Sequence, residues 1–267
     1  MTFAKRVTVQ ALQEMKRSGE KIAMLTAYDF YTAKLLDGAG VDVMLVGDTV
    51  GMAVAGHKTT LSVRLDDIVY HAEMVARGTR RAMIIGDMPF LSYQLTVDRA
   101  VENAGRLMQD GKVHGVKLEG GRAMVPVIKR ILRAGIPVMG HLGLTPQSVH
   151  RFGGFSVQGK DPDSASRLRE AAKALEDAGC FAIVLECIPS SLARSVTQSL
   201  VVPTIGIGAG PECDGQVLVT PDMLGLTGFE TKYIKQYAKL KDVVTEAAGR
   251  YVAEVKQGEY PSAEHEY

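Results

Sequence analysis

The sequence has few cysteines, no excess of either charge and no long apolar run, and each absence excludes a class of protein. The 267 residues include only three cysteines, Cys180, Cys187 and Cys213. Three is a small and odd number of cysteines, so a disulfide framework is not expected. The 31 basic and 30 acidic residues contain no basic block, so binding to nucleic acid or an anionic membrane is unsupported. No stretch approaches the roughly 20 apolar residues of a membrane span, and charged residues interrupt the N-terminal region where a signal peptide would lie. We therefore expect a cytoplasmic protein whose partners are small molecules.

The chain does contain eight short apolar runs, separated for most of its length by segments with helical periodicity. The runs are 22–27, 41–46, 82–85, 115–118, 136–139, 181–185, 204–207 and 216–219. Continuous apolar runs indicate buried parallel strands, and their alternation with helices indicates βαβ units. The length suits one barrel, so we predict a single α/β domain over 1–267 with a (βα)8 TIM barrel fold. Only the connection between the last two runs is too short for a full helix.

Several helix boundaries follow from capping residues and periodicity. An amphipathic helix at about 8–18 is expected to close the bottom of the barrel. Asp29, Thr96 and Ser190 are predicted N-caps of helices that follow the first, third and sixth runs. The last helix is predicted at about 232–256, where apolar residues recur with helical spacing.

Five of the apolar runs lead into an ionisable residue, and this pattern points to the function. These residues are Asp48, Asp87, Glu119, His141 and Glu186. The C-terminal ends of barrel strands converge on one mouth, so these side chains are expected to meet there. Four carboxylates and a histidine in one cavity repel one another unless a cation or shared protons compensate them. The pattern therefore predicts a metal-assisted active site.

Asp48 and Asp87 occupy matching positions, each after an apolar run and a glycine, in VGD and IGD. Carboxylate oxygens of this kind suit Mg²⁺, which commonly takes one or two of them and keeps several waters. The alternative is that each aspartate is a helix N-cap, which is the commoner role of a single Asp after a strand. Because both aspartates follow an apolar run and a glycine, and Glu119 follows a third run, we favour a metal site over two helix caps.

The other three positions have a functional and a structural interpretation each. Lys117 and Glu119 are two positions apart on a strand, so their side chains share one face. A lysine in an apolar run needs a carboxylate or an anionic ligand as partner, which favours a role in the site. The alternative is a structural salt bridge in the barrel core. His141 suits an acid/base, a metal ligand or an orienting group, and the alternative is a buried structural histidine. Glu186 follows three apolar residues and suits a general base, with a metal ligand or a buried ion pair as alternatives.

Two glycine-containing segments also stand out. The sequence GIGAGPECDG at 206–215 lacks the Rossmann spacing, which leaves phosphate binding and close backbone packing as equal alternatives. The segment from Gly143 to Gly159 is long and contains several glycines, which predicts a mobile loop that covers the mouth of the barrel when substrate binds; the alternative is a rigid loop packed at a subunit contact.

Taken together, the strings around these positions resemble the ketopantoate hydroxymethyltransferase family nearly end to end and in the family's order. They are LTAYD (25–29), VMLVGD (43–48), GDMPF (86–90), VKLEGG (116–121), GHLGLTPQS (140–148), LECIP (185–189) and IGIGAG (205–210). The resemblance implies a (βα)8 barrel of the phosphoenolpyruvate/pyruvate type that forms homodecamers. It also implies Mg²⁺ and, as co-substrate, 5,10-methylenetetrahydrofolate. The implied reaction transfers a hydroxymethyl group to 3-methyl-2-oxobutanoate, giving 2-dehydropantoate, in the first committed step of pantothenate synthesis.

Carried over by motif, the resemblance implies a metal site and its neighbours. Asp48 and Asp87 would bind Mg²⁺ and lie against the substrate, and Glu119 would complete the metal site. Lys117 would hold the 2-oxo acid.

The resemblance assigns the remaining site residues as well. Glu186 would accept the proton, and His141 would lie in the same substrate pocket. The family commonly has serine after the first aspartate, where it binds the substrate carboxylate; this chain has Thr49, which retains the hydroxyl. A Pro-Lys/Arg-Phe segment that often precedes the family's last helix is replaced here by Thr231-Lys232-Tyr233.

Two other functions compete with this interpretation. A related Mg²⁺ barrel lyase or mutase would act on another 2-oxo acid, but such enzymes usually add a catalytic cysteine in a mobile loop, which the sequence does not show. A non-catalytic barrel would not require Lys117, Glu119 and Glu186 at one mouth. Metal-dependent exchange of the C3 proton of 3-methyl-2-oxobutanoate without folate would separate both from the favoured function.

Overall fold

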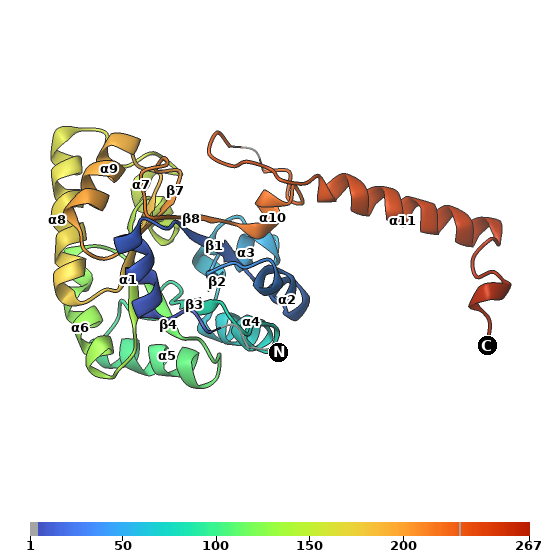
Figure 1. Cartoon of the computed structure of the whole chain (residues 1–267), viewed down its shortest axis with the longest axis horizontal. Helices are drawn as coiled ribbons and strands as arrows, with labels where there is room; N and C mark the ends of the chain where they lie inside the picture. Colours follow the sequence, from blue (N-terminus) through green and yellow to red (C-terminus); the bar gives the residue numbers. More distant parts are fainter. Residues whose placement is uncertain (1–4, 230) are drawn as a thin grey trace. The chain divides into compact units, whose positions relative to one another are not determined.

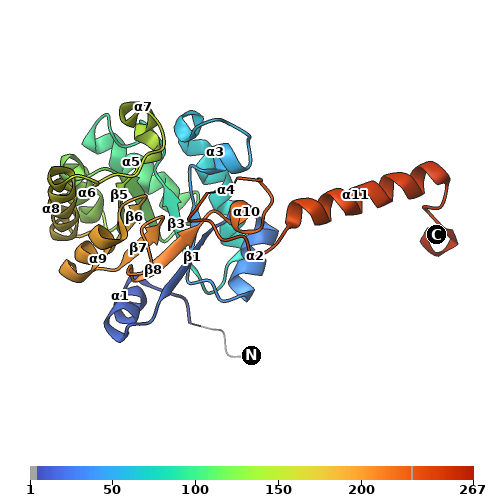
Figure 2. The same ribbon diagram turned by 90° about the horizontal axis from the view of Figure 1, so that it is seen from above.

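Eight parallel strands close into a barrel in sequence order, with β8 paired to β1 (Figures 1 and 2). The computed structural model describes residues 5–229 and 231–267, and it divides into two compact units, Met1–Leu218 and Val219–Tyr267. The strands are β1 Ile22–Thr26, β2 Val43–Val46, β3 Met83–Asp87, β4 Gly115–Glu119, β5 Val138–Gly143, β6 Ala182–Glu186, β7 Thr204–Ile207 and β8 Gly215–Leu218. The predicted (βα)8 barrel is confirmed for the first unit, and a single domain over 1–267 stays a prediction.

Helices alternate with most of the strands. The first unit contains α1 Val9–Ser18, α2 Phe30–Gly38, α3 Val50–Ala53, α4 Leu65–Gly78, α5 Val97–Gln109, α6 Val125–Arg133, α7 Val149–Phe152, α8 Pro162–Ala178 and α9 Ser190–Ser199, with 3₁₀ turns η1 Thr60–Ser62, η2 Arg122–Met124 and η3 Pro146–Ser148. The second unit contains α10 Thr220–Met223, α11 Leu240–Gln257 and the 3₁₀ turn η4 Ala263–His265. None of the helices among the described residues has the length and apolar character needed to cross a membrane.

Two of the three predicted N-caps are confirmed. The side chain of Asp29 accepts a hydrogen bond from the Thr32 amide at 2.9 Å, and Thr96 caps α5 in the same way. The Ser190 prediction is wrong by one residue, because Pro189 precedes the helix with an extended backbone (ψ 137°) and Ser190 is already the first helical residue.

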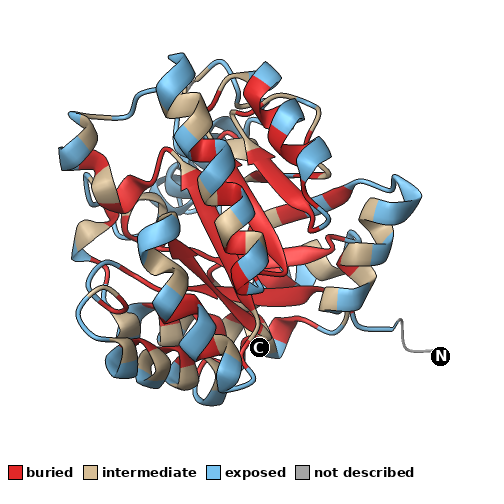
Figure 3. Ribbon diagram, turned by 90° about the vertical axis from the view of Figure 1, so that its left-hand side faces the viewer, coloured by how far each residue is buried: buried red, intermediate tan, exposed pale blue. Residues whose placement is uncertain are grey.

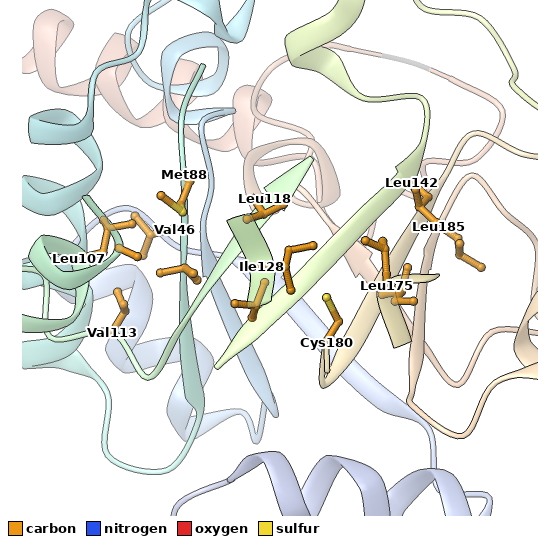
Figure 4. Close-up of a cluster of buried hydrophobic side chains, with 14 of the residues drawn as sticks. Val46, Met88, Leu107, Val113, Leu118, Ile128, Leu142, Leu175, Cys180 and Leu185 are labelled. Carbon is orange, nitrogen blue, oxygen red and sulfur yellow. The ribbon is translucent and has the colours of Figure 1, made fainter. Parts of the chain in front are cut away.

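Most strands, such as β2, β3 and β4, bury both faces, which explains why their sequences are continuously apolar (Figure 3). On β1 and β8 the outward-facing Ala23 and Gln216 are exposed. On β2, Val43 and Leu45 belong to a cluster inside the barrel, whereas Met44 and Val46 belong to a cluster between the strands and the helices. Figure 4 shows part of that outer cluster. The period-2 alternation of a strand thus assigns every position to the inside or the outside of the barrel.

Four strands continue further toward their C-terminal ends than the sequence predicts. Strand β3 runs through Asp87, β4 through Glu119, β5 through Gly143 and β6 through Glu186, so the ionisable residues at these ends lie within the sheet rather than after it. Strand β5 starts at Val138 instead of residue 136, since Pro137 has no amide hydrogen to donate to the ladder.

Helix α1 closes the N-terminal end of the barrel, as predicted. Its Leu12 is buried in the inner cluster together with Ile22. The ammonium of Lys16 donates to the Asp214 carboxylate at 2.8 Å and to the carbonyl oxygens of Thr197 and Val202, both at 3.0 Å. This network ties α1 to the segments around β7 and β8.

The short connection between β7 and β8 contains no helix, and its glycines allow close packing. A Cβ at Gly215 would lie 2.5 Å from the carbonyl oxygen of Ile22, and one at Gly210, where φ is +82°, would collide with the Ser190 hydroxyl. These contacts support the packing interpretation of the glycine-rich segment.

The segment from Gly143 to Gly159 is not the irregular loop that the sequence predicts. It contains η3 and α7, because Pro146 starts a turn and Val149 buries its side chain. Its last part is held by a hydrogen bond from the Gln158 amide to the Cys187 carbonyl at 2.8 Å. Closure of this segment on substrate binding stays a prediction.

In the second unit, the last helix begins at Leu240 rather than near residue 232. The amide of Tyr237 donates to the carbonyl of Met223 at 2.8 Å, and the amide of Leu240 donates to that of Leu224 at 2.9 Å. These bonds hold the residues before Leu240 against α10. Those residues therefore cannot join the helix, which begins at Leu240.

We predict that Lys16→Met lowers the free energy of unfolding by about 2–3 kcal/mol, because it removes a charged hydrogen bond and leaves two carbonyl oxygens without their donor. The matched control is Arg17→Met on the same helix, whose ion pair with Glu14 is 64% and 67% exposed and should contribute less than about 1 kcal/mol. Urea unfolding of both variants is the measurement. Equal losses would show that the Lys16 network does not hold α1 in place.

Candidate active site

The ionisable residues found at the strand ends lie on the inside of the barrel. On β3, Asp87 has the same parity as Met83 and Ile85 of the inner cluster, and Glu186 continues the inner row of β6. The strand register places Glu119 opposite His141. Asp48 follows β2 and is also buried. The barrel therefore brings the predicted residues together at its C-terminal mouth.

Lys117 and Asp87 form a buried ion pair at 2.6 Å, with side chains 5% and 2% exposed. The second oxygen of Asp87 accepts a hydrogen bond from the backbone amide of Asp48 at 3.2 Å. Although burial opposes the charged ammonium, the carboxylates of Asp87, Glu119 and Asp48 hold the pKa of Lys117 above its usual value. Lys117 is therefore a permanent cation in this site.

His141 lies between two carboxylates. Its Nδ1 is 3.4 Å from Oε1 of Glu119 and its Nε2 is 3.1 Å from Oε2 of Glu186. These are ion-pair contacts without hydrogen-bond geometry. Burial and Lys117 both disfavour the charged imidazolium, but the contacts with Glu119 and Glu186 outweigh them and raise the pKa of His141 to about 9.

The structure rejects the helix-cap alternative for both aspartates. The residue that precedes α3 is Thr49, and Asp87 is still part of strand β3. The carboxylate of Asp48 instead accepts a hydrogen bond from the side-chain amide of Gln147 at 2.9 Å. Both carboxylates are thus directed at the interior of the site.

The charges inside the site are unbalanced. Burial raises the pKa of Asp48 well above its usual value, and the nearby carboxylates of Asp87 and Glu119 raise it further. Burial also raises the pKa of Asp87, although Lys117 opposes that rise. Oε1 of Glu119 is buried without a hydrogen-bond partner among the described residues. An added cation would relieve this excess of buried negative charge.

The donor set suits an open magnesium site. Among residues 5–229 and 231–267, no three His, Cys, Asp or Glu side chains form a complete ligand set by themselves. Mg²⁺ does not require one, since it usually takes one or two carboxylates and fills its remaining positions with water and substrate oxygens. Asp48 and Asp87 could supply those carboxylates, with Glu119 beside them.

Sequence patterns missed three polar residues that the fold adds to the site. The hydroxyl of Tyr28 is 2.6 Å from that of Thr49, the buried hydroxyl of Tyr93 accepts a hydrogen bond from the amide of Glu119 at 3.1 Å, and Gln147 contacts Asp48. Uncharged residues in connecting segments have no periodic signal. Only their places in the strings LTAYD and GHLGLTPQS marked Tyr28 and Gln147.

A cavity of about 530 Å³ lies at the other end of the barrel, beside α1. It is lined by residues such as Gln10, Glu14 and Arg81, and it contains none of the candidate site residues. Arg81 is already paired with Asp42 at 2.7 Å. This cavity is therefore not the candidate active site. The candidate active site is identified by the ionisable residues at the C-terminal ends of the strands.

Comparison with known proteins agrees with the resemblance in the motifs. The family model described as ketopantoate hydroxymethyltransferase matches residues 6–263. The 3-methyl-2-oxobutanoate hydroxymethyltransferase of Syntrophomonas wolfei is 54% identical over 261 residues, which cover 97% of this chain and 95% of that protein.

Solved structures give the type of barrel. A 2,3-dimethylmalate lyase of the PEP mutase/isocitrate lyase superfamily matches with a TM-score of 0.60 at 17% identity, covering 97% of this chain and 91% of its own. A phosphoenolpyruvate phosphomutase from Streptomyces platensis matches with a TM-score of 0.61 at 12% identity, covering 94% and 88%. At these identities the likeness shows the fold alone, and it confirms the (βα)8 barrel. By its family model and its close relatives, the chain belongs to the ketopantoate hydroxymethyltransferase family.

Proposed function

We propose that this protein transfers a hydroxymethyl group from 5,10-methylenetetrahydrofolate to 3-methyl-2-oxobutanoate, with one water molecule supplying the hydroxyl oxygen, to give 2-dehydropantoate and tetrahydrofolate. This would be the first committed step of pantothenate synthesis. Membership of the family supports the reaction. The observation that carries it in the structure is the buried excess of carboxylates around Lys117, next to the His141–Glu186 pair.

The reaction needs a cation at the keto oxygen of the substrate. Asp48 and Asp87 would hold Mg²⁺, with Glu119 beside them, and the ion when bound acts as a Lewis acid that stabilises an enolate. Lys117 is already paired with Asp87 at 2.6 Å, so its charge lies where negative charge develops on the substrate oxygens.

Glu186 would remove the C3 proton in this proposal. Its side chain is 16% exposed, compared with 2% for Asp87 and 3% for Glu119, so it faces the more open part of the mouth. The imidazole of His141 lies 3.1 Å from this carboxylate and would orient it toward the substrate. The resulting enolate carbon then attacks the one-carbon unit that the folate delivers.

Thr49 would bind the substrate carboxylate. Its hydroxyl makes no helix-capping bond in α3, and it lies 2.6 Å from the hydroxyl of Tyr28. Tyr28 is buried, so it orients the Thr49 hydroxyl without competing water. A threonine in place of the family's common serine therefore retains the polar contact.

The assembly and location belong to the same proposal. A homodecamer in the cytoplasm follows from the family resemblance.

We expect Asp48→Asn and Asp87→Asn each to weaken Mg²⁺ binding and to lower activity without unfolding the barrel. Each change removes one negative oxygen donor but preserves the shape of the side chain. Calorimetric titration with Mg²⁺ measures the effect, and thermal unfolding controls for the fold. Unchanged metal affinity in both variants would remove these residues from the metal site.

We expect Glu186→Gln to retain binding of Mg²⁺ and substrate but to slow exchange of the C3 proton by about 10²–10⁴-fold, the usual contribution of a positioned acid/base group. Deuterium uptake into 3-methyl-2-oxobutanoate without folate, followed by NMR, isolates this step. Exchange at the wild-type rate would assign the base to another group. The same assay distinguishes the proposed enzyme from a non-catalytic barrel, which would catalyse no metal-dependent exchange.

Gly143→Ala tests how Glu186 is positioned. Gly143 pairs with Glu186 in the sheet, and a Cβ there would collide with the Glu186 carbonyl oxygen. The matched control is Gly153→Ala, since Gly153 also has positive φ (+69°, against +94°) but has open space around it. Both changes should cost about 1–2 kcal/mol of stability through the left-handed backbone, and Gly143→Ala should cost more because of the collision. Only Gly143→Ala should slow C3 proton exchange, by about tenfold or more. Equal exchange rates in the two variants would show that this contact does not position the base.

A further inference from the structure

Gln147 is a buried polar residue that sits between two of the carboxylates of the site. It lies in η3, just after β5, and is 6% exposed. Its side-chain Nε2 donates to the Asp48 carboxylate at 2.9 Å, and its backbone amide donates to Oε2 of Glu119 at 3.1 Å. One residue therefore contacts a carboxylate from the β2 end and another from the β4 end.

The orientation of the Gln147 amide is determined from both sides. Its Oε1 lies 2.8 Å from the hydroxyl of Tyr93 and accepts from the Gln94 amide at 3.2 Å. Its Nε2 donates to the Met88 carbonyl at 3.0 Å as well as to Asp48. Because donors surround the oxygen and acceptors surround the nitrogen, a flipped amide would lose these bonds.

The charge of this residue matters as much as its geometry. Lys117 already contributes a cation to the site through Asp87. A second cationic donor at Asp48 would cancel the negative charge that attracts a metal, whereas a neutral amide orients the carboxylate and leaves its charge in place.

We propose that Gln147 is a positioning residue of the metal site, which holds the Asp48 carboxylate in its metal-binding orientation and links it to Glu119. This inference rests on the proposed magnesium-dependent function. The competing explanation is a hydrogen-bond network that only stabilises the fold. The two explanations differ in whether metal affinity changes separately from stability.

The test compares Gln147→Met with Gln94→Met, a change of the same kind in the same network. Gln94→Met removes a bond to Oε1 of Gln147 but leaves the bond between Gln147 and Asp48 intact. Mg²⁺ alone is titrated into each variant by calorimetry, and thermal unfolding is measured alongside. We expect Gln147→Met to weaken Mg²⁺ binding by about 10–100-fold, as lost partners of metal ligands do, and Gln94→Met to change it less than about threefold.

If Gln147→Met does not fold, Gln147→Asn is measured instead. The asparagine side chain is one carbon shorter, so its amide does not reach Asp48. Equal weakening in the position-147 and position-94 variants, or none in either, would overturn the positioning role. Asp48→Asn is measured as the reference. If Asp48→Asn and the position-147 variant both leave Mg²⁺ affinity unchanged, the metal site itself is refuted. If Asp48→Asn weakens Mg²⁺ binding and the position-147 variant does not, only the role of Gln147 fails.

Discussion

The strict alternation of inner and outer positions along the closed parallel barrel is the constraint on which the rest of the structure depends. Most strands bury apolar residues on both faces, inside against the other strands and outside against the helices. The inner rows of β3, β4 and β6 end in Asp87, Glu119 and Glu186. The same parity that packs the core therefore places charged groups at one mouth.

Burial then sets the chemistry of this mouth. A carboxylate that loses its hydration requires a partner, and the barrel supplies one lysine and one histidine for Asp48, Asp87, Glu119 and Glu186. Such an imbalance of buried charge costs stability. In the proposed function, a bound cation and the 2-oxo acid chelated to it would complete the charge balance of the site.

Neutral groups position these charges. Gln147 and Tyr93 occupy the first layer of contacts around Asp48 and Glu119, and they come from segments that follow β5 and β3. Gly143 has a related role, because the absence of a side chain lets β5 approach the backbone of Glu186. Precision in the site thus depends on residues without charge.

The sequence alone determined the strand count, the barrel, the N-terminal helix and the inventory of charged residues, because apolar runs and their polar ends are local patterns. It misplaced the start of the last helix, since hydrogen bonds to Met223 and Leu224 hold the residues before it. It also missed the turns between Gly143 and Gly159, where Pro146 starts a turn and Val149 buries its side chain. Only the tertiary structure could pair Lys117 with Asp87 or bring Gln147 to Asp48, 99 residues away along the chain. Those partners are selected by which strand ends become neighbours when the barrel closes, and no local pattern records that.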